Sequence, residues 1–304
     1  MTSTPGPAAD ADIPAYLERL GIPGLADVHV HFLPEPMQRK VWGFFDRADV
    51  EYGTDWPITY RFDEDERLRR LRSFGVRAIP ALTYPHKPGM AQWLNDWCAE
   101  FARRVPDAVH CATLYPEPGV GDYVAAAIDD GARLLKMHVQ VGVFAPDDPL
   151  LDPAWEVLAD KGIPVVIHAG SGPTPGPYTG PGPVEATLRK HPSLTLVIAH
   201  LGMPEYHRFA DLAERYDHVH LDTTMAATDF TERMAPMPAD YPHRLADLGD
   251  RVVLGSDYPN IPYPYAHQIE GLARLDLGDE WMRKVLWRNG AALLGLESDG
   301  VGRA

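Results

Sequence analysis

The sequence predicts an α/β fold, a closed (β/α)8 TIM barrel that forms a single domain over residues 1–304. Short apolar runs alternate with amphipathic helical stretches along the chain, and several of those stretches end at a glycine. Parallel strands need helical crossovers and cover on both faces of the sheet, so eight such units of this total length favour a barrel. The competing open, doubly wound sheet lacks support because no G-x-G-x-x-G motif follows an apolar run.

The apolar runs and the stretches between them give the expected elements in chain order. Strands are predicted at 25–32, 76–82, 108–114, 133–139, 163–168, 194–200, 218–224 and 251–257. Helices are predicted at 64–74, 90–103, 120–130, 152–161, 204–216 and 265–275. Three of these helices are followed by glycines that can adopt the left-handed conformation typical of a helix end, Gly75, Gly131 and Gly162.

A long insertion, residues 33–63, follows the first predicted strand and lacks a clear helix or strand pattern. It mixes aromatic with basic residues, whereas a second loop, 170–183, is rich in proline and glycine. Loops that leave the carboxyl ends of barrel strands surround the active site of this fold. We therefore expect both segments to border the mouth of an active site.

Composition and charge exclude several classes of protein. The chain has 28 Lys+Arg against 43 Asp+Glu, a net charge of −15, which argues against a surface for nucleic acid or anionic lipid. It has no apolar stretch of ~20 residues that could span a membrane, and its first twelve residues are too polar and acidic for a secretory signal. The two cysteines, Cys98 and Cys111, suit buried reduced thiols. We expect a cytoplasmic protein that acts on a small molecule.

Histidines gather where predicted strands end. Side chains alternate between the two faces of a strand, and His29 and His31 are two residues apart on the first predicted strand. Both therefore point to the inside of the barrel. The carboxyl ends of the other strands meet at the same rim, and they carry Lys136, His138, His168, His200 and Asp257. Neutral imidazoles together with one carboxylate are typical ligands of a divalent cation, so the pattern predicts a metal centre. Asp222, which ends the seventh strand, is expected to accept a hydrogen bond from a ligating imidazole.

The chain also resembles the amidohydrolase superfamily, in particular the branch of aminocarboxymuconate-semialdehyde decarboxylase and similar carboxy-lyases. The matching segments are DVHVHF (27–32), GARLLKMHVQ (131–140), PVVIHAGSG (164–172), VIAHLG (197–202), LGSDYPN (254–260) and RNGAALLGL (288–296). The resemblance implies one divalent metal, zinc, held by His29, His31, His168 and Asp257. It also implies that His200 acts beside the metal-bound water as an acid, a base or an orienting group, and that the protein is a homodimer.

Lys136 leaves two interpretations open. In binuclear members of the superfamily a lysine on this strand is carboxylated and bridges two metals, whereas single-metal members have an arrangement similar to Lys136-x-His138. We expect a single metal, with Lys136 and His138 facing the substrate. Further candidates for substrate contact are Arg61 and Trp42 in the insertion, His86 after the second strand, and Asn260 after the last strand.

The same residues could serve two reactions. A divalent ion lowers the pKa of its bound water from about 15.7 towards ~7, and with Asp257 as base and His200 as proton donor this leads to hydrolysis of an amide, ester or lactone. An unsaturated or aromatic carboxylate would instead be protonated at carbon and lose carbon dioxide, a reaction that favours an arginine to hold the carboxylate. We expect hydrolysis, with decarboxylation as the alternative. Two-metal phosphoester hydrolysis and a catalytically silent metabolite-binding barrel are further alternatives.

Overall fold

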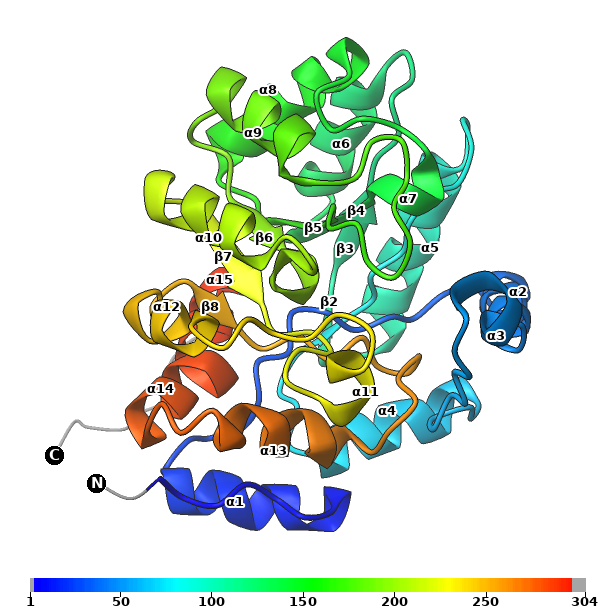
Figure 1. The fold of residues 1–304 in the computed structure, drawn as a ribbon. Coiled ribbons are helices and arrows are strands. Elements are labelled where there is room, and N and C mark those ends of the chain that lie inside the picture. The colour runs from blue at the N-terminus through cyan, green and yellow to red at the C-terminus, as the bar shows by residue number, and fades with distance from the viewer. Residues whose placement is uncertain (1–2, 297–304) are drawn as a thin grey trace, which may run out of the picture.

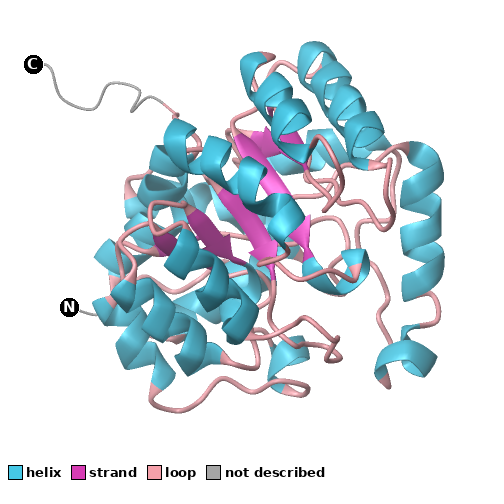
Figure 2. Cartoon of the chain, turned by 90° about the horizontal axis from the view of Figure 1, so that it is seen from above, coloured by secondary structure: helices cyan, strands magenta, loops and turns pink. Residues whose placement is uncertain are grey.

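A six-stranded parallel sheet lies at the centre of the computed structural model, which describes residues 3–296 (Figure 1). Its order follows the chain, from β3 to β8. The strands are β3 (Cys111–Thr113), β4 (Leu134–His138), β5 (Val165–His168), β6 (Leu196–Ile198), β7 (Val219–Asp222) and β8 (Val252–Val253). A separate parallel pair, β1 (Ile79–Pro80) and β2 (Ala108–Val109), precedes them. Helices surround the strands when the molecule is seen from above (Figure 2).

Residues 25–31 connect the segments beside β1 to the segment after β8 through backbone hydrogen bonds. On one side the oxygen of Val30 accepts from the nitrogen of Leu82 at 3.0 Å, and Leu25 bridges to Val76. On the other side the nitrogen of Val28 donates to the oxygen of Leu254 at 2.9 Å. The regular strand ladders alone therefore do not close the ring, and single bridges and hydrogen bonds connect the first predicted strand to its neighbours.

The TIM-barrel class is confirmed, but the predicted strands are longer than the observed ones. Residues 25–32 were expected to form a regular strand and make only isolated bridges. The predicted strand 108–114 is divided at His110 into β2 and β3, and only two residues of 251–257 are regular. The single domain predicted over 1–304 includes residues 1–2 and 297–304, which lie outside the described residues, so its extent stays a prediction.

All six predicted helices are confirmed to within two residues. They are α4 (Glu64–Ser73), α5 (Ala91–Arg104), α6 (Val120–Asp129), α8 (Asp152–Lys161), α10 (Tyr206–Arg215) and α13 (Tyr265–Arg274). Further helices are α1 (Ile13–Leu20), α7 (Val139–Gly142), α9 (Pro181–Lys190), α11 (Asp229–Glu232), α12 (Tyr241–Asp247), α14 (Asp279–Arg283) and α15 (Asn289–Leu293). None of the helices in the described part of the chain combines the length and the apolar character needed to cross a membrane.

Local sequence explains where α4 begins and ends. The carboxylate of Asp63 accepts a hydrogen bond from the nitrogen of Glu66 at 2.8 Å and so caps the amino end. Acidic residues occupy the first turn and arginines the last, which complements the helix dipole. Gly75 then adopts a φ of 88°, the left-handed conformation that the sequence predicted at this helix end.

The insertion 33–63 contains two helices, α2 (Glu35–Phe45) and α3 (Ala48–Tyr52), which lie together at one side of the molecule in Figure 1. The sequence analysis found no clear helix or strand pattern over this segment and so did not identify these two helices. α2 has 11 residues and three aromatic side chains, whereas α3 has only 5 residues. The aromatic side chains pack against one another, with the rings of Phe45 and Trp56 at 5.1 Å.

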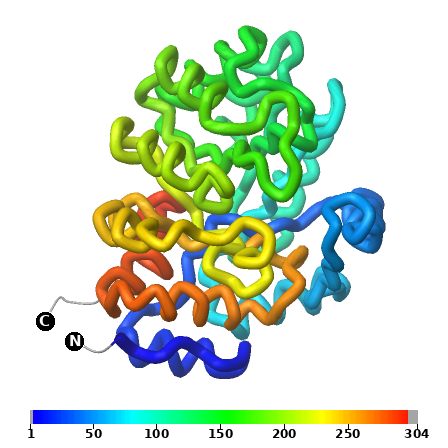
Figure 3. Tube along the Cα trace, in the orientation of Figure 1, coloured from blue at the N-terminus to red at the C-terminus, as the bar shows by residue number. Residues whose placement is uncertain are grey.

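The amino-terminal segment packs against helices from the other end of the chain (Figures 1 and 3). The carboxylate of Asp10 accepts from the nitrogen of Ala266, at the start of α13, at 2.9 Å. The Arg283 side chain in α14 donates to the oxygen of Leu20, at the end of α1, at 2.7 Å. These contacts hold the two ends of the described chain together on the outside of the barrel.

Residues along each strand alternate between two apolar clusters. One cluster packs beneath the outer helices and includes Leu135, Met137, Val165 and Ile167. The other fills the inside of the barrel and includes Val28, Val109, Leu134, Val166, Val197 and Val253. On the inner face, the residues that follow towards the carboxyl ends are polar, and they build the site described next.

Candidate metal centre

Three side chains converge at the carboxyl ends of the barrel strands. The imidazoles of His29 and His31 and the carboxylate of Asp257 each offer one ligand atom, and these atoms all lie within 4.8 Å of one another. The Nε2 atom of His31 lies 2.9 Å from Asp257 Oδ1, and that of His29 lies 3.6 Å from the same oxygen. His29 and His31 are buried and Asp257 is 15 % exposed, so the group lies at the base of an opening.

The backbone turns sharply at two of the polar strand ends. Asp257 has a φ of 69° and His200 a φ of 58°, left-handed values that are uncommon for residues other than glycine. Gly255 lies two residues before Asp257, and a Cβ at position 255 would lie 2.2 Å from Thr224 Oγ1 and 2.9 Å from His29 Cβ. A residue without a side chain at 255 therefore lets the last strand approach the first histidine closely.

Hydrogen bonds fix the orientation of both histidine rings. Asp222 Oδ2 lies 2.9 Å from His29 Nδ1, and the backbone oxygen of Leu82 lies 2.9 Å from His31 Nδ1. These acceptors place the ring proton on Nδ1, so each Nε2 keeps a lone pair. Asp222 also accepts from the nitrogens of His200 and Thr224. The expected role of Asp222 as acceptor for an imidazole is confirmed.

Lys136 lies directly beside this group. Its side chain is fully buried, and its Nζ atom is 2.8 Å from His29 Nε2. Burial lowers the pKa of Lys136 to about 8, and the negative charges of Asp222 and Asp257 oppose this change.

Three further histidines extend from the group along the rim. His138 and His168 are register partners on β4 and β5, and their rings stack at 4.1 Å with an angle of 11°. The ring of His200 lies 4.6 Å from that of His168 and 5.4 Å from that of His29. His168 Nε2 lies 3.2 Å from the oxygen of Gly172. His168 thus lies outside the group of three, with His200 between them, and its assignment as a ligand stays a prediction.

Burial controls the ionisation of the site. It lowers the pKa of His29 to about 4, with a contribution from the charge of Lys136, and that of His200 to about 4. It also lowers the pKa of His138 and His168 well below the usual range. Burial alone would raise the pKa of Asp257, but the imidazoles around its carboxylate, with His31 Nε2 at 2.9 Å, hold it well below its ordinary value. Neutral imidazoles and an ionised carboxylate are the forms that bind divalent metals.

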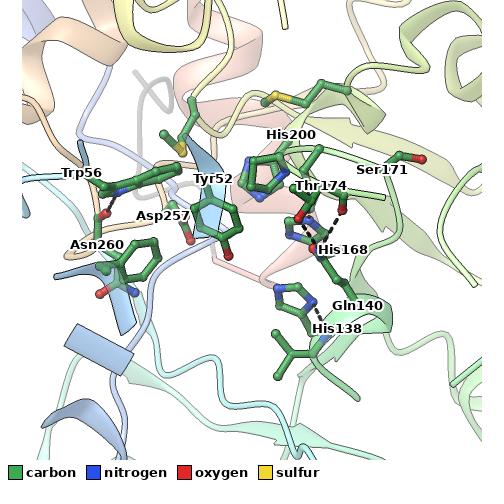
Figure 4. Close-up of a pocket in the computed structure, with 18 of the residues that line it drawn as sticks. Tyr52, Trp56, His138, Gln140, His168, Ser171, Thr174, His200, Asp257 and Asn260 are labelled. Carbon is green, nitrogen blue, oxygen red and sulfur yellow. Dashed lines mark hydrogen bonds between the residues drawn. The ribbon is translucent and has the colours of Figure 1, made fainter. Parts of the chain in front are cut away.

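The site opens into a cavity of about 890 Å³, which is within the size range of small-molecule pockets. The insertion, the loop 170–175 and the segments after β6 and β7 form its walls. Figure 4 shows Tyr52 and Trp56 of the insertion facing the histidines across this space. Both segments that the sequence predicted to border an active-site mouth therefore line the cavity.

The candidate substrate contacts divide into two groups. Lys136, His138, His86 and Asn260 line the cavity, and their contact with a substrate stays a prediction. Arg61 and Trp42 are not among the lining residues, and their assignment as substrate-contact residues stays a prediction. Arg61 is exposed and forms an ion pair with the exposed carboxylate of Asp46. Trp42 instead lies behind the wall, where its indole nitrogen donates to Asn260 Oδ1 at 3.2 Å.

Other polar residues of the site were missed by the sequence analysis. Glu205 accepts from the nitrogen of Ser171 at 3.0 Å and also from its hydroxyl, which ties the loop after β5 to the loop after β6. Asp27 accepts from the nitrogen of His29 at 3.0 Å and from the hydroxyl of Tyr265 at 2.7 Å. Asp27 is an acidic residue inside an apolar run, and this position was the signal that could have identified it as part of the site. No local pattern pointed to Glu205.

Comparison with known proteins places this arrangement among related folds. Residues 26–296 match the model of the family described as amidohydrolase. No match to this chain is found among the curated proteins. An uncharacterised TIM-barrel protein from Bordetella bronchiseptica is 20% identical, with a TM-score of 0.70, over 88% of this chain and 97% of that chain.

Two further solved structures represent different reactions. A 5-carboxyvanillate decarboxylase from Novosphingobium aromaticivorans, complexed with manganese and 4-hydroxy-3-methoxy-5-nitrobenzoic acid, is 17% identical over 94% of this chain and 92% of that chain, with a TM-score of 0.54. A putative 2-pyrone-4,6-dicarboxylic acid hydrolase from Pseudomonas putida is 17% identical over 90% of this chain and 98% of that chain, with a TM-score of 0.59. At such identities the likeness shows the fold. The family match over 26–296 shows that this chain belongs to the amidohydrolase family, whose members are metal-dependent hydrolases or carboxy-lyases.

Proposed function

We propose that this protein is a metal-dependent hydrolase that cleaves an amide, ester or lactone bond of a small organic molecule. The observation that carries the proposal is the convergence of two oriented imidazoles and an ionised carboxylate at the base of a cavity. The donor set fits a divalent transition metal because the ligand atoms of both imidazoles and of the carboxylate lie within 4.8 Å of one another while each Nδ1 is already hydrogen-bonded.

His29, His31 and Asp257 would hold the metal, and we propose His168 as a further ligand and zinc as the ion. Bound there, a divalent ion would lower the pKa of a coordinated water from about 15.7 towards ~7 and so supply hydroxide. The carboxylate of Asp257 is ionised and can accept the proton that this water loses. The neutral imidazole of His200 lies beside the group and can hydrogen-bond to the reacting carbonyl group or carry a proton to the leaving group.

Decarboxylation is the second candidate function. The aromatic side chains of the insertion, such as Phe44, Phe45 and Trp56, would accept an aromatic ring, and Lys40 and His86 are polar groups at the same cavity. Among the described residues that line the cavity, however, there is no arginine to hold a carboxylate bidentately. This composition favours hydrolysis.

Three accompanying assignments belong to the same proposal. We propose a single metal, with Lys136 unmodified. We also propose a cytoplasmic location, which the two buried free thiols Cys98 and Cys111 support. A homodimer is proposed as the assembly, and light scattering of the purified protein would test it. Elemental analysis of protein purified without chelator should give one equivalent of zinc per chain, and two equivalents would favour the binuclear alternative.

The activity is tested by supplying the zinc-loaded protein with two panels of compounds. One contains aryl esters, lactones and amides, and the other contains aromatic and unsaturated carboxylates, with carbon dioxide release as the readout. We expect hydrolysis in the first panel, its loss in Asp257→Asn, and its retention in Asp46→Asn, which changes an exposed acid outside the cavity. Carbon dioxide release without hydrolysis would replace the proposal by the decarboxylase, and equal turnover by Asp257→Asn would overturn the role of the metal centre.

A further inference from the structure

The walls of the cavity are apolar above the metal centre. Val41, Phe44 and Phe45 from α2 and Trp56 after α3 form one side, and Met225 and Met234 lie elsewhere in the lining. Such walls bind a substrate by removing its apolar surface from water, so they favour a substrate with an apolar body.

Lys136 and Asp257 line the base of the cavity, where Lys136 Nζ lies 2.8 Å from His29 Nε2 and Asp257 Oδ1 lies 2.9 Å from His31 Nε2. The charged residues of the lining above this base do not compensate a charge on the apolar body of a substrate. Lys40 and Glu51 are exposed at the rim, where water screens them. Glu205 is occupied by its hydrogen bonds to Ser171, and burial lowers the pKa of His86, which favours its neutral form. A carboxylate or ammonium group on the substrate body would therefore lose water without gaining a buried partner.

Asn260 offers a polar group whose orientation the structure determines. An indole nitrogen can only donate a hydrogen bond, so the atom of Asn260 that faces Trp42 Nε1 at 3.2 Å must be the amide oxygen. The indole of Trp56 donates to the backbone oxygen of Asn260 at 2.7 Å, which fixes the main chain as well (Figure 4). The side-chain amide of this 2 % exposed residue is therefore held in one orientation.

The nitrogen of that amide remains available. Asn260 Nδ2 donates to none of the residues that the structure describes, and it is not among the buried polar atoms that lack a partner. It is therefore not sealed from the cavity that Asn260 lines. The backbone nitrogen of Asn260 donates to the oxygen of Asp257 at 2.9 Å, so this donor is attached to the turn that carries a predicted metal ligand.

We propose that the site selects an uncharged substrate with an apolar body and a hydrogen-bond acceptor, which Asn260 Nδ2 recognises while Trp42 holds the amide in position. The acceptor is a carbonyl, ester or ether oxygen. This inference rests on the proposed hydrolase function and names the class of its substrate. Trp42 is a positioning residue, because it acts through Asn260 and does not line the cavity.

Matched aryl acetates test the substrate class. Phenyl acetate, 4-carboxyphenyl acetate and 4-(aminomethyl)phenyl acetate share the bond to be cleaved and differ in the charge on the body. We expect kcat/KM for phenyl acetate to exceed that of either charged ester by about 10-fold or more, corrected for their rates of alkaline hydrolysis, since burying an unpaired charge opposes binding. Equal or faster hydrolysis of the carboxylated ester would overturn the inference while leaving the hydrolase function intact.

Asn260→Asp and Trp42→Phe test the donor. Asn260→Asp keeps the shape of the side chain and replaces the donor by a negative charge, so we expect kcat/KM for phenyl acetate to fall by about 10-fold. The aminomethyl ester should lose less, because the new carboxylate attracts its ammonium group. Trp42→Phe removes the N–H that orients the amide and should reduce kcat/KM for phenyl acetate mainly through KM, and Trp93→Phe, on the exposed face of α5, should change nothing.

The results of these experiments distinguish a failure of this inference from a failure of the proposed hydrolase function. If Asn260→Asp binds zinc and folds but lowers kcat/KM for all three esters equally, the donor role is overturned. If Asn260→Asp does not fold, Trp42→Phe decides, and an unchanged KM in that variant overturns the role of the amide. Absence of any ester hydrolysis that depends on Asp257 would instead contradict the proposed function itself.

Discussion

The inner face of this barrel changes character along each strand. Near the middle of the strands it is a closed apolar cluster, with Leu134 on β4 and Val166 on β5. Two residues further on, the same strands carry Lys136 and His168, which are also largely buried but polar. The difference lies in the partners: each polar group at the carboxyl ends meets another polar group, as Lys136 meets His29. Buried polar groups are retained where hydrogen bonds compensate the loss of water, and the apolar region holds the frame that positions them.

The largest effect is expected at the polar end. Asp257→Ala removes a carboxylate that lies 2.9 Å from His31, so metal binding should weaken and activity should fall by more than the roughly 10–100-fold typical of losing a residue that only supports a ligand. Metal content and kcat/KM, measured on the same preparation, check this. A variant with full activity would show that the polar end is not the reaction centre.

The apolar region should respond in stability instead. Leu134→Ala creates a cavity in the inner cluster and should lower the free energy of unfolding by about 2–5 kcal/mol. Urea unfolding of the metal-free protein measures this, with Leu150→Ala, at a 47 % exposed position, as the matched control. The metal stoichiometry of the folded variant should be unchanged. A variant that folds normally but loses the metal would contradict the division between the two regions.

Asp222 lies where the two regions meet. Asp222→Asn weakens the acceptor of the His29 Nδ1 hydrogen bond, so we expect a loss of roughly 10–100-fold in metal affinity or activity. Titration with a chelator of known affinity measures the change, and Asp217→Asn, at an exposed ion pair, serves as control. If both variants bind the metal equally well, orientation of His29 by Asp222 is unimportant.

His220 is a polar residue within the apolar region, and its substitution should have the smallest effect on stability. Burial lowers the pKa of His220 to about 4, and its Nδ1 atom has no hydrogen-bond partner among the described residues. Because the folded pKa lies below the unfolded value of about 6.5, the stability from the neutral ring is present above pH 6.5 and is lost as the pH falls towards 4. His220→Gln should therefore lose less stability than the wild type between pH 7 and pH 5, by on the order of 1 kcal/mol. Parallel urea curves at the two pH values test this, and identical losses would contradict it.

Local pattern was sufficient for much of the architecture. The helices follow from amphipathic spacing and capping residues such as Asp63, because these signals act within one turn of chain. Several helices were not predicted, among them α2 and α3 in the aromatic insertion, where rings such as those of Phe45 and Trp56 pack at 5.1 Å. Observed strands are shorter than the apolar runs because left-handed residues such as His200 and Asp257 turn the chain away at their ends.

Sequence alone determined which residues share the inner face, since the two-residue period of a strand already places His29 beside His31 and Lys136 below His138. Only the tertiary structure decided that Arg61 faces water, that Trp42 supports Asn260 from behind the wall, and that Glu205 ties two loops together. These roles depend on how segments far apart in the chain pack against one another. No short-range pattern encodes such contacts, because the energy of each one exists only after the barrel has brought its partners together.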